Sequence, residues 1–379
     1  GKNSFTQKMF TTFQFMVSIA LLLATLVIID QLKFLKTQEI GINKDQVLAI
    51  NLSPNEEALG FEYMKNEIRR QPDVVDVAVS SLSLFKGGYS IYFTTIPGTD
   101  EQLSLSHMNV DDHFIDLMDI EYVTRFDEVQ LKGNLIANES AAEKLQVSED
   151  SLAKEISLGM SKGFIAGVTH DFNYTSLKNK VEPMVMSVLD DTTRSMITYG
   201  GAMYVKLGKG ADVKEALASV KEEVSKFQPD APFEYYFLDE AFNNLYKSEE
   251  RMATLLSGFT FLAILIAGMG LLGMITFTLE RRVREFGIRK VLGASEARIT
   301  WMVMGEYLLI FVLSALFAVP LAWWAMCEWL TSFSYRIDVG MVHPLLAVTI
   351  TLFVGISTIA LRTWHASRAN PAESLRVEA

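Results

Sequence analysis

Four long apolar runs constrain this chain more than any other feature of its sequence. The first, Phe10–Ile29, carries no charged residue, and the others are Met252–Leu279, Met302–Leu330 and Leu345–Leu361. A helix needs about 20 mostly apolar residues to cross roughly 30 Å of hydrocarbon. We therefore predict four membrane-spanning helices, and not the buried helices of a globular core.

The first run has the features of an uncleaved anchor. Small residues near Ser18 and Ala20 resemble a signal-peptide cleavage site, but the apolar sequence continues past them to Ile29. The chain begins with Gly1 in place of a methionine, which indicates a fragment or a processed chain.

Charge divides the chain into two kinds of sequence. Residues 30–251 hold 22 Lys and Arg against 37 Asp and Glu, a net charge of −15, whereas the remaining residues hold 12 against 8. The overall charge of −11 argues against a nucleic-acid binder, and a composition that is 50% hydrophobic excludes disorder. A long acidic segment within an apolar, slightly basic remainder indicates a membrane protein with one large water-facing domain.

Basic residues near the ends of spanning helices favour the cytoplasmic side. With four spans, eleven of them share one side, and the opposite short loop, residues 331–344, holds only Arg336. We expect both termini in the cytoplasm and residues 30–251 outside. The eleven residues are Lys2, Lys8, Arg281, Arg282, Arg284, Arg289, Lys290, Arg298, Arg362, Arg368 and Arg376.

Two strand–helix–strand patterns bracket the external segment and predict a split α/β sandwich. The first comprises Gln46–Leu52, Glu56–Arg70 and Val74–Ser80, and the second comprises Met203–Leu207, Val213–Phe227 and Phe233–Phe237. An inserted α+β subdomain is expected at about 84–199, with strands at Tyr89–Ile96 and Phe164–Val168 and a helix at Glu139–Leu145.

Helical periodicity also flanks the external domain, at Asp30–Ile40 and at Asp239–Arg251. Both segments are expected to extend the neighbouring spans into a two-helix stalk, or else to form short amphipathic helices on the domain itself. The fold class is thus an α-helical membrane protein with four transmembrane helices and a large α+β extracytoplasmic domain.

Catalytic motifs are absent from the sequence. There is no G-x-x-x-x-G-K-[ST] loop, no G-x-S-x-G elbow and no H-E-x-x-H pair. The adjacent His170 and Asp171 would point to opposite faces of a strand end, and no nucleophile is placed beside them. Asp111–Asp112 and Asp190–Asp191 are expected to be cap or turn residues. One cysteine and five scattered histidines predict no metal site. We expect no enzymatic activity on this chain.

The loop between the second and third spans, TLERRVREFGIRKVLGASEAR at residues 278–298, is the most informative motif. Ile288, Val291, Leu292 and Ile299 form an apolar stripe on a helix, while Arg281, Glu285 and Arg289 follow one another at i, i+4. An amphipathic helix at the inner membrane surface is predicted, with Gly293 as its C-cap and Ser295 as the next N-cap. A basic loop that only anchors the topology is the alternative. Glu306, near the inner end of the third span, is either functional or reaches out to water.

Several segments resemble one family. Glu280-Arg281, Arg284 to Lys290 and Gly293-Ala294 are similar to the ER…REIGIRKAxGA motif of MacB/FtsX-type ABC transporter permeases. The ending Asn370 to Arg376 resembles their NPxxSLR tail. Further segments resemble their periplasmic core domain, namely Gly41–Leu48, Gly167–Tyr174 and Phe237–Arg251. The start of the chain looks more like the second half of a double-length, eight-span permease.

The resemblance implies a bacterial inner (plasma) membrane protein with four parts: residues 1–29, a periplasmic MacB-like core at 30–251, an FtsX-like part at 252–362 with a coupling helix at 280–298, and a tail at 363–379. It implies that a separate cytoplasmic ABC ATPase binds ATP and Mg²⁺, and that this chain holds no cofactor. The residues implied to couple the two chains are Glu280, Arg281, Arg284, Glu285, Gly287, Arg289, Lys290 and Gly293.

The expected function is that of a permease subunit, or half-subunit, that couples ATP hydrolysis to motion of its periplasmic domain during export of drugs, peptides or lipoproteins. Expected partners besides the ATPase are a second permease copy or the first half of a double-length permease, a periplasmic adaptor or substrate, and membrane lipid. The alternative is a non-transport receptor or scaffold whose external domain regulates a partner such as a cell-wall hydrolase.

Overall fold

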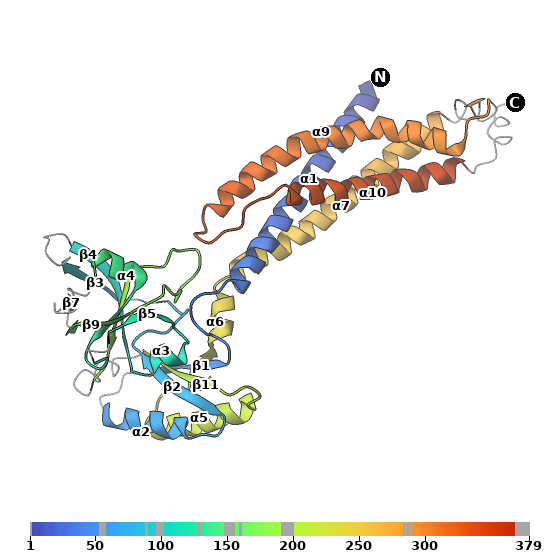
Figure 1. Cartoon of the computed structure of the whole chain (residues 1–379). Helices are drawn as coiled ribbons and strands as arrows, with labels where there is room; N and C mark the ends of the chain where they lie inside the picture. The colour runs from blue at the N-terminus through green and yellow to red at the C-terminus, as the bar shows by residue number, and fades with distance from the viewer. Residues whose placement is uncertain are drawn as a thin grey trace. The chain divides into compact units, whose positions relative to one another are not determined.

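The computed structural model divides the chain into two compact units, residues 1–36 with 247–379 and residues 37–246. They are called the membrane unit and the external unit below, and Figure 1 shows their elements. The structure describes residues 2–52, 58–87, 90–95, 102–126, 130–147, 156–158, 161–190, 201–282, 285, 288–289 and 292–367.

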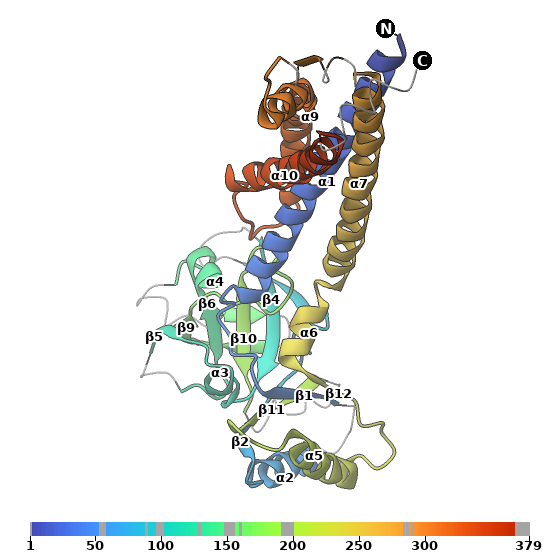
Figure 2. The ribbon, with the colours of Figure 1, turned by 90° about the vertical axis from the view of Figure 1, so that its right-hand side faces the viewer.

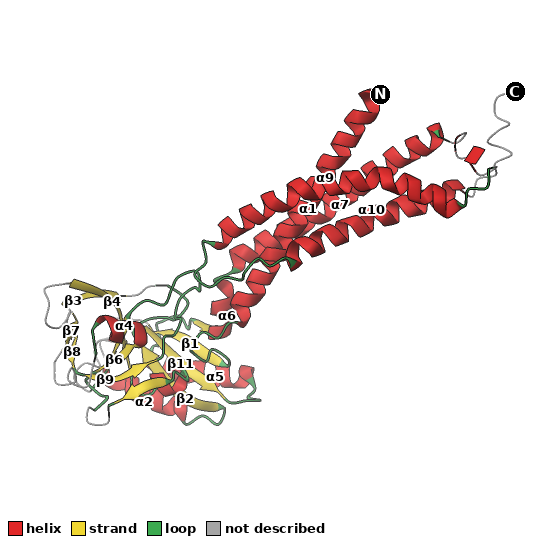
Figure 3. Cartoon of the chain, turned by 45° about the horizontal axis from the view of Figure 1, so that its top comes forward, coloured by secondary structure: helices red, strands yellow, loops and turns green. Residues whose placement is uncertain are grey.

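Among the residues that the structure describes, the membrane unit has four helices long and apolar enough to cross a membrane, which is the predicted number. Each contains a stretch that is long and apolar enough to cross a membrane, and the helices are coloured red in Figure 3. They extend beyond the predicted spans at nearly every end, and their bounds are α1 Lys2–Thr37, α7 Lys247–Arg281, α9 Glu296–Leu330 and α10 Val342–Ser367.

Side-chain contacts join these helices along their length. Thr25 on α1 and Thr260 on α7 share a hydrogen bond of 2.9 Å between their hydroxyl groups. Phe15 on α1 and Phe311 on α9 place their ring centroids 4.4 Å apart. The Phe311 ring also lies against Gly355 of α10, where an added Cβ would overlap it. This glycine therefore lets α9 and α10 approach closely.

At one end of the membrane unit, polar side chains tie the helices and the loop after α9 together. Lys36 on α1 forms an ion pair with Glu250 on α7. The fully buried Gln31 donates from its amide nitrogen to the Tyr335 carbonyl (2.9 Å), and its amide oxygen accepts from the Ile337 N–H (2.9 Å). The loop between α9 and α10 is thus fastened to α1.

The external unit is built on one ten-stranded mixed sheet, whose order is β12-β1-β11-β2-β4-β10-β6-β9-β5 with β3 paired to β4. The bounds are β1 Val47–Leu52, β2 Val74–Ser80, β3 Ser90–Thr95, β4 Gln102–Val110, β5 Tyr122–Arg125, β6 Leu135–Asn138, β9 Ile165–Thr169, β10 Met184–Val188, β11 Gly201–Leu207 and β12 Tyr235–Phe237. A separate hairpin comprises β7 Ile156–Leu158 and β8 Ser161–Gly163.

The two predicted strand–helix–strand patterns are present and share one part of this sheet. Helices α2 (Ala58–Arg69) and α5 (Val213–Phe227) lie side by side against β2 and β11 in Figures 1 and 2. They bury an apolar cluster against the strands because their inward side chains recur at helical spacing, as Ala216, Val220 and Val224 do on α5.

The insert between β2 and β11 continues the same sheet. A single residue pair, Ser80 with Val110, joins β2 to β4. Beside it, β2 pairs with β11 from Ser80 and Ala202 onward. The preceding Gly201 has φ +150°, and an added Cβ there would overlap the Ser80 carbonyl oxygen. The insert was predicted as a subdomain between the two patterns, and its strands instead extend their sheet. Its helices are α3 Phe114–Leu117 and α4 Glu139–Lys144.

Two successive aspartates after β4 have different surroundings. Asp111 pairs with Lys65 of α2, and both side chains are buried, with 8% and 3% exposed. Burial raises the pKa of Asp111 even though Lys65 opposes the rise. Asp112 pairs with Lys132 at 3.0 Å, and both of these side chains are at least a third exposed. Asp111 was expected to be a cap or turn residue, and it does accept the His113 N–H (3.2 Å). The Lys65 ion pair is its larger role.

One histidine is buried in the external unit. His107 on β4 is 3% exposed and lies 2.7 Å from the Ser187 hydroxyl, measured from Nε2. Burial lowers its pKa from 6.5 to about 4, because the charged form would lose its hydration.

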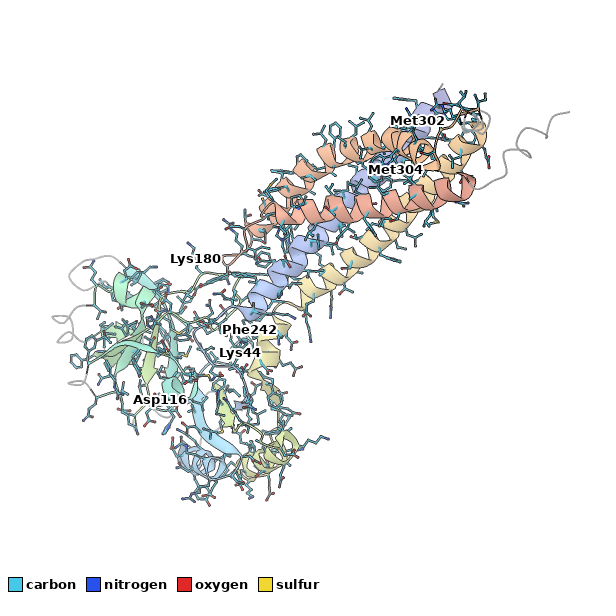
Figure 4. All side chains as sticks on the ribbon, turned by 45° about the vertical axis from the view of Figure 1, so that its right-hand side comes forward. Lys44, Asp116, Lys180, Phe242, Met302 and Met304 are labelled. Atoms are coloured by element: carbon cyan, nitrogen blue, oxygen red, sulfur yellow. The ribbon has the colours of Figure 1, made fainter. Side chains whose placement is uncertain are left out.

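The predicted return stalk is not one helix. Helix α6 (Leu238–Asn244) ends before α7 begins, and a turn at Leu245 and Tyr246 separates them. Tyr246 is fully buried in the external unit, and its hydroxyl accepts the Leu177 N–H (2.9 Å). Phe242 of α6 is buried as well, with the Lys44 ammonium 5.1 Å from its ring centroid (Figure 4). The apolar periodicity therefore came from packing within the external unit. The outgoing stalk segment does continue α1, as far as Thr37.

Candidate functional site

The candidate site lies where α7 ends and α9 begins. The start of α1, the end of α7, the start of α9 and the end of α10 lie at the same end of the membrane unit in Figures 1 and 2. Four spans require these helix ends to share one side.

Two of the predicted coupling residues belong to α7 itself. Glu280 and Arg281 lie in its last turn, and the Arg281 guanidinium lies 4.2 Å from the centroid of the Phe277 ring. At the other end of the motif, Glu296 already begins α9. Both spanning helices therefore extend into the range 280–298 that was predicted for the coupling helix.

The segment between α7 and α9 contains an ion pair and ends in a helix C-cap. Glu285 Oε1 lies 2.6 Å from Arg289 Nη2, at the predicted i, i+4 spacing. Gly293 has φ +90°, and the Ala294 N–H donates to the Arg289 carbonyl at 2.9 Å. These are features of a Schellman C-cap, and they agree with the predicted role of Gly293.

The next helix begins as predicted. The Ser295 hydroxyl accepts the Arg298 N–H (3.3 Å) and caps the N-terminus of α9. The segment from Glu285 to Gly293, called the inner segment below, is thus bounded by a helix end on one side and a capped helix start on the other.

The two apolar side chains of the inner segment that the structure describes are exposed. Ile288 is 58% exposed and Leu292 is 81% exposed, and their i, i+4 spacing places them on one face. Glu285 and Arg289 are each 41% exposed. An amphipathic segment of this kind suits a membrane surface, with its apolar face in lipid and its charged face in water. Arg284, Gly287, Lys290 and Val291 lie outside the described residues, as does the tail motif around Pro371.

Sequence reasoning missed a partner for Glu306. Its Oε1 lies 2.5 Å from Nη1 of Arg282, the residue that follows α7. This hydrogen bond is the main cause that raises the pKa of Arg282 above its usual value. Beside it, the Tyr307 hydroxyl donates to the Thr278 hydroxyl (3.2 Å). A carboxylate within an apolar run needs a cation nearby, and that requirement could have indicated Arg282.

His170 and Asp171, which are adjacent in the sequence, contact residues at the start of α4. Asp171 accepts the N–H of Ser140 (3.0 Å) and its hydroxyl (2.5 Å) at the first turn of α4. His170 pairs instead with Glu139 at 3.1 Å. Among the residues that the structure describes, no group of three or more His, Cys, Asp or Glu side chains could hold a metal ion.

The membrane unit matches a known family. Residues 257–371, which include most of α7 and all described parts of α9 and α10, match the family described as FtsX-like permease C-terminal. The chain carries an FtsX-like permease domain. The similarity to FtsX-type permeases that the motif predicted is confirmed. The family match and the four described apolar helices together indicate a membrane protein.

A curated relative and two solved structures are also similar. The uncharacterized ABC transporter permease YknZ of Bacillus subtilis (strain 168) is 23% identical over 133 residues, or 34% of this chain and 32% of that protein, so the match spans about a third of the relative. The periplasmic region of MacB from Actinobacillus actinomycetemcomitans is 15% identical with a TM-score of 0.38, over 54% of this chain and 94% of that one. The extracellular domain of YknZ from Gram-positive bacteria is 13% identical with a TM-score of 0.36, over 50% and 97%.

Proposed function

We propose that this chain is the permease subunit, or half of a longer permease, of an ABC transporter. It would convert ATP hydrolysis on a separate ATPase chain into motion of its external unit. The FtsX-like domain and the similarity to an ABC transporter permease support this proposal. ATP and Mg²⁺ would bind the ATPase, and this chain would act without a cofactor of its own.

The observation that carries the proposal is the capped inner segment between two apolar helices. Its charged face is half-exposed and therefore available to a cytoplasmic protein. We propose that the coupling element consists of Glu280, Arg281, Arg284, Glu285, Gly287, Arg289, Lys290 and Gly293, and that Ile288 and Leu292 contact lipid.

A displacement of the inner segment would be transmitted toward the external unit by α7 and α1. At about 1.5 Å per residue, α7 is about 50 Å long, well beyond the roughly 30 Å of hydrocarbon. The Thr25–Thr260 hydrogen bond and the Lys36–Glu250 ion pair join α7 to α1, so the two helices would move together. In the proposed orientation the basic end of the membrane unit lies in the cytoplasm of a bacterium, and the acidic external unit lies on the opposite side of the plasma membrane.

The substitution Glu285→Lys tests the proposed docking. It removes an exposed ion pair that contributes only about 0.5 kcal/mol to folding, so the membrane unit should remain intact. We expect loss of the ATPase stimulation that the wild-type chain produces, measured as ATP hydrolysis after co-purification in detergent with stand-alone ATPase subunits from the same genome.

Glu222→Lys is the matched control, because Glu222 is an exposed helical residue of the external unit that also pairs with a basic residue four positions later, Lys226. It should leave stimulation unchanged. Full stimulation by the Glu285→Lys chain would contradict the assigned docking segment. If no ATPase binds the wild-type chain in its natural full length, a receptor or scaffold role would replace the transport proposal.

A further inference from the structure

Arg282 and two charged side chains of the inner segment form a chain of contacts that begins and ends on α9. Glu306 of α9 binds Arg282 at 2.5 Å. The Arg282 Nε lies 4.0 Å from Glu285 Oε2, and Glu285 binds Arg289 at 2.6 Å. The Arg289 guanidinium then contacts the sulfur of Met302, also on α9. Figure 4 labels Met302 near the beginning of that helix.

The two contact points on α9 are one helical turn apart. Met302 and Glu306 are four residues apart and therefore lie on the same face of the helix. Two contacts at this spacing fix the direction of the inner segment as well as its position, because a single contact would leave it free to rotate. The segment is therefore attached to the start of α9 through side chains, in addition to its covalent link to both helices.

The end of α7 is packed firmly at the same place. The Tyr307–Thr278 hydrogen bond joins α9 to α7 next to the Glu306 pair. Ile275 and Leu279 of α7 share a buried apolar cluster with Val303 of α9. A rigid base of this kind transmits displacement, since packed side chains have few alternative arrangements.

We propose that Arg282 and Glu306 are positioning residues that fix the inner segment on α9, so that movement of a docked ATPase displaces α9 together with α7. This inference rests on the proposed function and adds α9 to the helices that carry the motion. It also assigns Glu306 a role that the sequence left open.

The competing explanation is that Arg282 only neutralises a carboxylate near the hydrocarbon. The two explanations differ for Glu306→Leu. Leucine needs no counter-ion, and replacing a partly buried carboxylate with an apolar residue preserves or improves folding of an apolar helix. A purely neutralising pair would therefore be dispensable in this variant, whereas a positioning pair would not.

The test uses the full chain in detergent with the ATPase that co-purifies with the wild type. Glu306→Leu, Arg282→Glu and Glu306→Arg should bind that ATPase within about threefold of wild type but lose its stimulation at least tenfold. The double variant Arg282→Glu/Glu306→Arg should recover stimulation to within about threefold. Arg298→Glu is the matched charge reversal, because Arg298 is an exposed basic residue of the same α9 terminus, and it should retain both properties.

Amide hydrogen exchange without the ATPase gives a second readout. The N–H groups of Leu292 and Ala294, bonded to the carbonyls of Ile288 and Arg289, should exchange at least fivefold faster in Glu306→Leu. Stimulation that persists in Glu306→Leu with unchanged exchange would overturn the inference while leaving the proposed function intact. So would a double variant that folds, as judged by its thermal stability, without recovering stimulation. Failure of the wild-type chain to bind any ATPase would instead overturn the proposed function and, with it, this inference.

Discussion

The substitution Asp111→Asn removes one partner of the buried ion pair in the external unit. Lys65 would keep its charge with 3% of its side chain exposed and would face a neutral amide. Breaking a buried pair in this way costs about 3–5 kcal/mol. The pair lies beside the single Ser80–Val110 link of the sheet, so the loss is expected to weaken that link as well.

Asp112→Asn is the matched control one residue further along the chain. Its partner Lys132 is half-exposed, and an exposed pair contributes about 0–1 kcal/mol. The variant Lys65→Met/Asp111→Leu removes both buried charges and should recover most of the stability lost in Asp111→Asn, since well-packed apolar residues often replace a buried pair without loss.

Pulse proteolysis of the full chain in detergent, over a series of urea concentrations, measures these differences in the external unit. With a urea dependence of about 2 kcal/mol per molar, a loss of 3 kcal/mol lowers the midpoint by about 1.5 M. Equal midpoints for Asp111→Asn and Asp112→Asn would refute the reasoning from burial. So would a double variant that is no more stable than Asp111→Asn.

Two further predictions concern a buried histidine and a helix contact. The pKa of His107 is lowered from 6.5 to about 4, so the unfolded chain takes up the proton first as pH falls, and up to about 3 kcal/mol of stability present above pH 6.5 should be lost toward pH 4. In the His107→Gln variant, the urea midpoint should change less between pH 6.5 and pH 4 than it does in the wild type. An unchanged pH dependence would show that His107 does not cause the loss. Gly355→Ala places a Cβ into the Phe311 ring and should lower the stability of the membrane unit by about 1–3 kcal/mol. The midpoint temperature of thermal unfolding, followed by tryptophan fluorescence, should fall accordingly. Gly258→Ala is its control, because no described heavy atom lies within 4 Å of a Cβ there, and an equal effect of both variants would contradict the packing argument.

Local patterns predicted much of this fold. The apolar helices follow from run length alone, and the strand–helix–strand patterns follow from periodicity; α5 was predicted at its observed bounds, Val213–Phe227. Gly293 and Ser295 were predicted as caps because capping depends on residues within one turn. Such features need no knowledge of distant residues.

Long-range pairing could not be predicted in the same way. Helical periodicity over Asp239–Arg251 left two interpretations open, a stalk or a short helix on the domain, because spacing alone does not reveal that Phe242 packs within the external unit. The Arg282–Glu306 pair joins residues 24 positions apart, and no local pattern indicates that the two meet. The sheet order has the same origin, since it depends on which strand edges meet once the chain is compact.

The antiparallel pairing of β2 with β11 brings the two ends of the insert together. The insert begins after Ser80 and ends before Gly201, and these two residues are neighbours in space. Chain segments whose ends lie close together can be lengthened, shortened or exchanged without rebuilding their host. Without the insert, β2 and β11 would form an ordinary β-hairpin beneath α2 and α5. The layer of β12, β1, β11 and β2 can therefore keep its pairing while the insert changes in length or structure.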